Sequence, residues 1–161
     1  MKLVGFLVSL LFVHEARASE PLRLCAPPLG LAIGGISLAD SRSAIVAKLG
    51  KPTRVGDYQS EDDGGVYTGS VLFYPHLEIN LDGLRGIERI ASVGPGARLP
   101  YGLKQGMSVQ QAADTLHFIR HGVDEDGVAV LPVCESDTDT EVRLHFENGA
   151  LRSAEIVEYG P

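Results

Sequence analysis

The sequence predicts an α+β fold in which two tandem units, each a helix, a loop and three antiparallel strands, form one sheet with both helices on one face. A capped helix signal occurs twice, and Ser108 follows Ser41 at the same interval at which Leu116 follows Leu49. Alternating strand patterns and a glycine turn follow each signal. Because a unit of ~65 residues with one helix has little core of its own, the two units are expected to join.

The first helix is expected to begin after Ser41, a favourable N-cap residue. Gly50 stands where a left-handed C-cap is needed, and Pro52 prevents the helix from continuing. Apolar residues recur at helical spacing and form one stripe, made of Ala44, Ile45 and Leu49. The sequence therefore predicts a short, well-delimited helix at the start of the first unit.

Three strands are expected after that helix. A polar loop is predicted to begin after Pro52 and to extend through residues 61–65, after which the pattern changes from helical to alternating. Strands are predicted at residues 66–74, 77–82 and 84–93, with a hairpin turn at Asp82-Gly83.

The second unit is expected to repeat this plan. Ser108 and Gln111 form a capping-box pattern, and the helix is predicted to run to about His121. Strands are predicted at residues 128–133, 142–147 and 151–158, with a turn at Asn148-Gly149.

Residues 1–18 are typical of a cleaved signal peptide. Lys2 precedes an apolar run over residues 3–13, and Ala16-Arg17-Ala18 is a small-x-small cleavage site. As a helix the run would rise about 16 Å, against about 30 Å for the hydrocarbon core of a bilayer, so it is too short to span one. The sequence therefore predicts an exported protein, periplasmic or secreted.

Residues 19–161 are expected to form a single mature domain made of two repeats, at about residues 35–93 and 102–158. The formal net charge of the chain is −7, and cleavage would make it more negative. An acidic surface argues against nucleic acid and anionic membranes as partners, and it is compatible with a basic protein partner. No later stretch is long and apolar enough to predict a membrane span.

The two cysteines of the predicted mature chain, Cys25 and Cys134, are expected to form a disulfide in an oxidising compartment. Closing a loop of roughly 100 residues would stabilise the fold by about 4–5 kcal/mol at most. A redox or metal-binding pair is the alternative, although there is no CxxC motif and no histidine near either residue. A lipid anchor on Cys25 is a second alternative. A lipidated cysteine usually follows a small residue, but here Leu24 precedes Cys25 and Arg23 precedes Leu24.

The pattern of the first unit supports a family resemblance. Residues 35–52 read Gly-x-x-x-x-x-Ser-x-x-x-Ile-x-x-x-Leu-Gly-x-Pro, and strands and an Asp-Gly turn follow. This run resembles the SmpA/OmlA (BamE-like) domain, and its duplication resembles the β-lactamase inhibitor protein (BLIP) fold. The second copy has His117 where the first has Gly50, so the family's helix stop is lost there. The resemblance implies a protein-binding platform, or alternatively a component supporting outer-membrane assembly.

Three candidate chemistries compete with simpler interpretations. His117 and His121 are four residues apart and could share a metal, but no third ligand is indicated, so helix-dipole stabilisation is the simpler reading. The acidic stretches at residues 124–127 and 137–141 do not match an EF-hand and are expected to be solvated loops, with calcium as the alternative. No nucleophile elbow, HExxH or phosphate loop occurs, so we expect no enzyme, metal or cofactor.

The face of the sheet away from the helices is the best candidate for binding. If the alternating apolar residues point to the helices, the polar residues between them point away. Tyrosines among mixed charges are typical of protein-binding surfaces, and an ordinary solvated face is the alternative. The predicted binding residues are Tyr67, Tyr74, Glu78, Asn80, Arg143 and His145.

Together these observations predict an exported, non-catalytic module that binds another protein through the open sheet face, for instance an enzyme that it inhibits. A cell-envelope component supporting outer-membrane assembly is the first alternative. A small hydrolase or metal-dependent enzyme using His117 and His121 with an acidic loop is the second.

Overall fold

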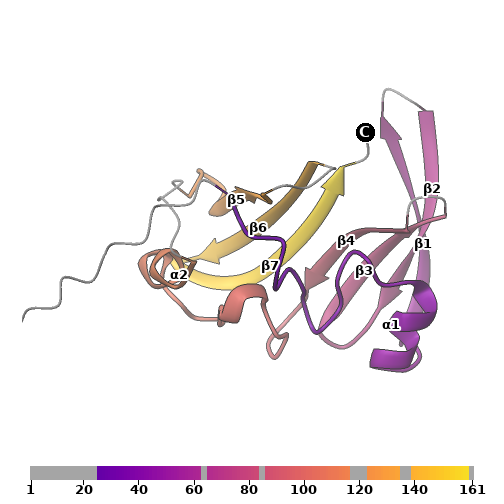
Figure 1. The fold of residues 1–161 in the computed structure, drawn as a ribbon, viewed down its shortest axis with the longest axis horizontal. Coiled ribbons are helices and arrows are strands. Elements are labelled where there is room, and N and C mark those ends of the chain that lie inside the picture. Colours follow the sequence, from indigo (N-terminus) through magenta and orange to yellow (C-terminus); the bar gives the residue numbers. More distant parts are fainter. Residues whose placement is uncertain (1–24, 63–64, 84–85, 117–122, 135–138, 160–161) are drawn as a thin grey trace, which may run out of the picture.

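A computed structural model describes residues 25–62, 65–83, 86–116, 123–134 and 139–159 of the chain. These residues form one seven-stranded antiparallel sheet with the strand order β1-β2-β3-β4-β7-β6-β5 (Figure 1). The predicted signal peptide, residues 1–18, lies outside the described part, as do His117 and His121.

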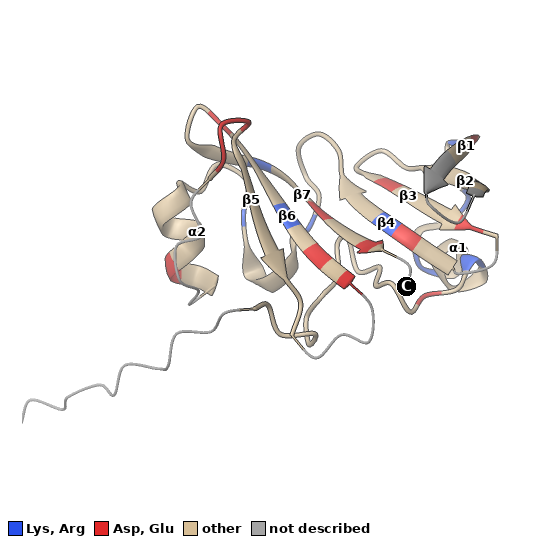
Figure 2. Cartoon of the chain, turned by 90° about the horizontal axis from the view of Figure 1, so that it is seen from above, with Lys and Arg blue, Asp and Glu red and all other residues tan. Residues whose placement is uncertain are grey.

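The sheet consists of two meanders that meet side by side. The first contains β1 (Arg54–Asp62), β2 (Gly65–Phe73), β3 (Leu77–Asp82) and β4 (Gly86–Ser92). The second contains β5 (Val128–Pro132), β6 (Asp139–Glu147) and β7 (Ala150–Tyr159). The last strand of each meander pairs with that of the other, so β7 lies between β6 and β4 (Figure 2).

Two α-helices of eight residues each occur in the described residues, α1 (Arg42–Leu49) and α2 (Val109–Leu116). Ser41 caps α1 as predicted, since its side chain accepts a hydrogen bond from the Ala44 backbone N–H at 3.2 Å. The predicted capping box also forms, because the Gln111 N–H donates to Ser108 Oγ and the Ser108 N–H donates to Gln111 Oε1.

The predicted fold class is wrong. The described chain is mostly sheet, and its first half has four strands where three were expected. The helices are too short to cover a face of seven strands, and each buries a single side chain fully, Ile45 in α1 and Ala112 in α2. The architecture is therefore one antiparallel sheet with two short helices, and not two helix–loop–three-strand units whose helices cover one face.

The strand that was not predicted is β1, which occupies most of the segment predicted as a polar loop. It pairs with β2 over its whole length, from Arg54 opposite Phe73 to Asp62 opposite Gly65. Because β1 is an edge strand, polar residues can occupy both of its faces without being buried. It therefore lacks the apolar alternation from which strands are recognised.

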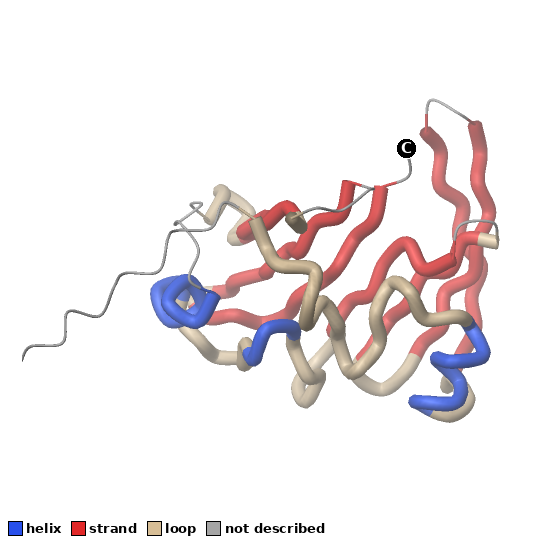
Figure 3. Tube along the Cα trace, in the orientation of Figure 1, coloured by secondary structure: helices blue, strands red, loops and turns tan. Residues whose placement is uncertain are grey.

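Loops close the core where helices were expected. Figure 3 shows long loop segments passing over the same side of the sheet on which the helices lie. These loops supply buried side chains from residues 26–40 and 94–108, namely Ile33, Ile36, Leu99 and Leu103. The chain preceding α1, predicted only as an extended lead-in, is thus a structural part of the core.

Cross-strand register places one apolar residue from each of six strands in a continuous line. Each member lies directly opposite the next, and each is buried. A fully buried side chain of this kind stabilises the fold by about 1.5–3 kcal/mol. From β2 to β5 the members of this apolar row are Leu72, Ile79, Ile90, Ile156, Val142 and Leu131.

The predicted disulfide between Cys25 and Cys134 is present, and it joins residues 109 positions apart. It anchors a short parallel contact next to it, in which the Ala26 N–H donates to the Pro132 carbonyl at 2.7 Å. The Cys134 N–H donates in turn to the Ala26 carbonyl, also at 2.7 Å. The bridge therefore holds the N-terminal segment against the β5 end of the sheet.

Candidate functional site

The face of the sheet opposite the apolar row, called the outer face below, carries a network of charged side chains. Successive residues of a strand point to opposite faces, so the neighbours of the apolar row in each strand lie on the outer face. Five of them and His145, which lies two positions after Arg143 in β6, form what we call the charged row. On β3, β4, β7 and β6 its members are Glu78, Arg89, Glu155, Arg143, Glu141 and His145. Figure 2 shows blue and red bands along these strands.

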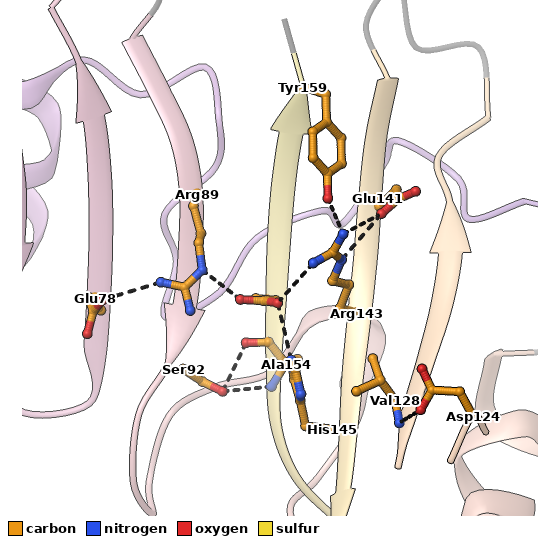
Figure 4. A network of polar contacts seen from close by, with 11 residues as sticks. Glu78, Arg89, Ser92, Asp124, Val128, Glu141, Arg143, His145, Ala154 and Tyr159 are labelled. Atoms are coloured by element: carbon orange, nitrogen blue, oxygen red, sulfur yellow. Dashed lines mark hydrogen bonds and ion pairs between the residues drawn. The ribbon is translucent and has the colours of Figure 1, made fainter. Parts of the chain in front are cut away.

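Glu155 is the centre of the charged row, and its side chain is only 10% exposed. Arg89 Nε lies 2.6 Å from one carboxylate oxygen, and His145 Nε2 lies 3.2 Å from the other. Arg143 Nη1 lies 3.9 Å from that second oxygen (Figure 4). Two arginines and a histidine from neighbouring strands thus surround one buried carboxylate.

The two arginines are also fixed on their far sides. Arg89 Nη1 donates to Glu78 Oε1 at 3.3 Å, so it bridges β3 to β7 across its own strand. Arg143 donates to Glu141 at 3.3 Å and to the Tyr159 hydroxyl. Its guanidinium also lies 5.6 Å from the centroid of the Tyr159 ring. Both guanidinium groups are therefore held in one orientation while about a third of each side chain stays exposed.

The electrostatics of the charged row follow from this arrangement. Burial raises the pKa of Glu155, but the hydrogen bond and positive charge of Arg89, together with His145, outweigh it and hold the pKa below its usual value. For Arg143, burial lowers the pKa of the guanidinium, while Tyr159, Glu141 and Glu155 raise it overall. The carboxylate and the guanidinium are each stabilised in the charged form.

Local sequence explains why a buried carboxylate is tolerated here. Glu155 lies directly opposite Arg143 on β6 and Ala91 on β4. Arg89 lies two positions before Ala91 in β4, and its Nε reaches Glu155 at 2.6 Å. A buried charge is costly unless it is paired and hydrogen-bonded, and Glu155 has ionic partners on both sides.

The structure brings some of the predicted site residues together and separates others. Glu78, Arg143 and His145 belong to the charged row. Asn80 lies opposite Arg89 on the same face, and its buried Oδ1 has no hydrogen-bond partner in the described residues. Tyr74 does not join them, because it is buried and its hydroxyl donates to the Gly50 carbonyl at 3.2 Å.

Tyr67 lies in β2 opposite Ser60, and its side chain is outside the described structure. Arg89, Glu155, Glu141 and Tyr159 were not predicted as site residues. For Glu155 a signal exists, because Ala154 and Ile156 are apolar and a residue between two inward-facing positions points outward. For Arg89 there is no such signal, because only one of its neighbours, Ile90, is apolar. The register of β3 and β4 also shifts between Asn80 and Leu81, which breaks the alternation in this part of β4.

Two aromatic rings extend the outer face over β1 and β2, and each lies against a glycine of the neighbouring strand. A Cβ atom at Gly56 would come within 3.2 Å of the Phe73 ring, and one at Gly69 would meet the Tyr58 ring. Arg54 stacks on Phe73 with its guanidinium 3.6 Å from the ring centroid. The outer face thus combines fixed charges with aromatic surface.

The acidic stretches differ in what the structure describes. The Asp124 carboxylate accepts a hydrogen bond from the Val128 N–H at 2.7 Å and so closes its own turn. Residues 135–138 are outside the described structure, and Asp139 begins β6. Within the described ranges no group of three His, Cys, Asp or Glu side chains is placed to hold a metal ion.

Among the helices of the described part of the chain, none is both long and apolar enough to cross a membrane. Comparison of the chain with protein-family models, with curated proteins and with solved structures finds no match.

Proposed function

We propose that this is an exported, non-catalytic protein that binds another protein through the outer face, with the charged row at the centre of the contact. Inhibition of an enzyme partner is one form that such binding takes, as the resemblance to the BLIP fold implies. The observation that carries the proposal is the pair of fixed, partly exposed arginines, Arg89 and Arg143, around the buried Glu155.

Pre-organisation is the physical reason to favour a contact surface over an ordinary solvated face. A free arginine loses side-chain entropy when a partner immobilises it, and that loss weakens binding. Arg143 is already held by Glu141 and Tyr159, and Arg89 by Glu78 and Glu155. Arginine and tyrosine are also enriched among the residues that contribute most to protein–protein binding.

Exposed apolar surface beside the charged row supports the same proposal. Tyr159 is 39% exposed and Val130, directly opposite Arg143 on β5, is 37% exposed. Protein interfaces combine such apolar and aromatic surface with a limited number of directed polar contacts. The chain's net charge of −7 favours a basic partner, because opposite charge accelerates encounter.

Export is supported by the disulfide between Cys25 and Cys134, since such bonds persist in oxidising compartments. The periplasm and the extracellular medium both satisfy this condition.

Fractionation of the native cells tests export, and it also tests the alternative of an outer-membrane assembly component, which would stay with the membrane. Metal analysis of the purified protein tests the alternative of a metal-dependent hydrolase.

The binding test uses the oxidised mature protein as bait for proteins of its own compartment. Arg143→Gln removes one of the two arginine charges beside Glu155. We expect this variant to bind the recovered protein at least tenfold more weakly, a loss of about 1.4 kcal/mol in binding free energy. Arg152→Gln is the matched control, because Arg152 lies in the same β6–β7 hairpin and pairs only with the exposed Glu147 among the described residues, at 3.2 Å. Equal binding by both variants, or recovery of no protein, would overturn the proposal.

A further inference from the structure

A cleft of about 940 Å³ lies apart from the charged row, between the start of α1 and the β1–β2 hairpin. Three parts of the fold line it: the residues at the helix start, facing residues of β1 and β2, and the turn that follows β3. Sites for small molecules typically enclose about 300–1,000 Å³. The cleft is therefore large enough for a ligand of several rings.

The cleft lies where the inner face of the sheet changes from apolar to polar. Val55 and Leu72 face each other on β1 and β2 and continue the apolar row. The next two pairs on the same face are Asp57 opposite Ser70 and Gln59 opposite Thr68. These four residues all line the cleft. Since Asp57, Gln59 and Thr68 are exposed, this part of the inner face is not covered by the core, and its polar groups are available to a ligand.

α1 reaches this polar surface through a polar contact. Arg42, the first residue of the helix, donates from Nη1 to Ser70 Oγ at 3.4 Å. Asp57, Gln59 and Thr68 are exposed. The helix start and the hairpin thus enclose a space lined by hydroxyl, amide and carboxylate groups.

An aromatic ring completes the lining from the other face of the hairpin. The Tyr58 ring lies against Gly69, and both residues line the cleft. The Tyr58 hydroxyl is hydrogen-bonded to Glu88 on β4, which fixes the orientation of the ring. β3 pairs with β2 only as far as Gly69 opposite Asp82, so the cleft lies at the corner where the hairpin extends beyond the rest of the sheet.

The chemistry of the lining selects among ligand classes. Anions are disfavoured, because three carboxylates of the lining, on Asp40, Asp57 and Asp82, outnumber the two nearby cations, the guanidinium of Arg42 and the ammonium of Lys48 that pairs with Asp40 at 2.7 Å. In the described residues no triple of potential ligands is placed for a metal ion. A wholly apolar ligand would leave the polar lining without hydrogen bonds.

We propose that this cleft binds a neutral oligosaccharide, with Asp57, Gln59 and Thr68 hydrogen-bonding its hydroxyl groups and Tyr58 stacking against the apolar face of a sugar ring. Carboxylate and amide groups offer paired acceptors and donors that suit neighbouring hydroxyls. Because Tyr58 and its neighbours in β1 point to opposite faces of the hairpin, the ligand must pass around the corner. A chain of several sugar units meets that requirement better than a single ring.

The test titrates the oxidised mature protein separately with maltotriose, cellotriose and chitotriose and follows backbone amide shifts by NMR. We expect at least one trisaccharide to give saturable shifts at Asp57, Gln59 and Gly69 with a dissociation constant near or below about 1 mM. No saturable shift with any of the three up to roughly 10 mM, ten times that constant, would overturn the proposal. Shifts confined to the charged row would overturn it as well.

Variants separate specific recognition from weak surface association. Asp57→Asn keeps the shape of the side chain but removes its charge and one acceptor, and we expect at least fivefold weaker binding. Asp126→Asn is the matched control, because Asp126 is exposed in the turn before β5, outside the cleft. Equal affinity of both variants would contradict the proposal. Arg143→Gln should leave sugar binding unchanged, so the failure of this proposal and that of the protein-binding proposal can be told apart.

Discussion

Arg89 Nε lies 2.6 Å from Glu155 Oε2, and this ion pair joins β4 to β7 where the two meanders of the sheet meet. Three directly opposed residue pairs make up the ladder between these strands, from Arg89–Val157 to Ala91–Glu155. The pair Ile90–Ile156 lies between them and faces the core. The same two charged residues therefore belong to the candidate binding surface and help to hold the two halves of the sheet together.

Replacing Glu155 by glutamine should destabilise the protein. The variant leaves Arg89 and Arg143 close together without the carboxylate between them, so like charges repel and hydrogen bonds weaken. We expect a loss of about 1–3 kcal/mol in the free energy of unfolding, measured by urea denaturation at neutral pH. Glu147→Gln, which affects the exposed pair with Arg152, should change stability by less than about 0.5 kcal/mol. Equal effects of the two variants would contradict a central role for Glu155.

The contribution of Glu155 should disappear in acid. Its pKa in the folded protein lies below the ordinary 4.5, so its carboxylate stabilises the fold above that pH and loses this effect as the pH falls through the folded pKa. The difference in unfolding free energy between the wild type and Glu155→Gln should therefore be full at neutral pH and should shrink steadily as the pH is lowered below 4.5. A difference that stayed constant over this range would show that the charge of Glu155 is not what stabilises the fold.

Local signals in the sequence were reliable where the chemistry is local. Ser41 and Ser108 cap their helices through hydrogen bonds to residues three positions away, and Gly50 has the positive φ of 80° that its place after α1 required. Such features depend on a few neighbouring residues. They could be predicted without knowledge of the rest of the fold.

The sheet was harder to predict because its edges and its register are not local. The strand β1 carries polar residues on both faces, so the sequence around Asp57 and Gln59 resembles a loop until its pairing with β2 is known. The inner face is closed by loop residues such as Ile33 and Leu103, which have no periodicity to reveal that they are buried. The amount of helix needed to cover the sheet was therefore overestimated.

The candidate site was predicted in part for the same reason. Strict alternation in β6 put Arg143 and His145 on the correct face. Tyr74 was misplaced because β2 ends at Phe73 and the chain turns there, with the Tyr74 N–H donating to the Leu77 carbonyl. Which charges meet across strands depends on register, and the link from Arg89 to Glu155 spans 66 residues of sequence.

Removing the disulfide should loosen one end of the sheet before it unfolds the whole. In a Cys25→Ser, Cys134→Ser double variant the free energy of unfolding should fall by up to about 4–5 kcal/mol, because the closed loop is long. The backbone amides at positions 26 and 134, which donate the two hydrogen bonds beside the disulfide, should lose their protection from hydrogen exchange. A melting temperature that is unchanged on reduction of the wild type would contradict this role of the bridge.

Gly69 should tolerate no side chain. A methyl group there would meet the Tyr58 ring and approach the backbone carbonyl oxygen of Leu81 to 2.5 Å, and the backbone cannot move aside without breaking the β2–β3 ladder. We expect Gly69→Ala to cost about 1–3 kcal/mol of unfolding free energy by urea denaturation. Gly83→Ala is the control, because a Cβ atom there has no neighbour within 4 Å, and it should be nearly neutral. If both alanine variants were equally stable, the close contact of Tyr58 with the β2 backbone, on which the shape of the cleft depends, would be wrong.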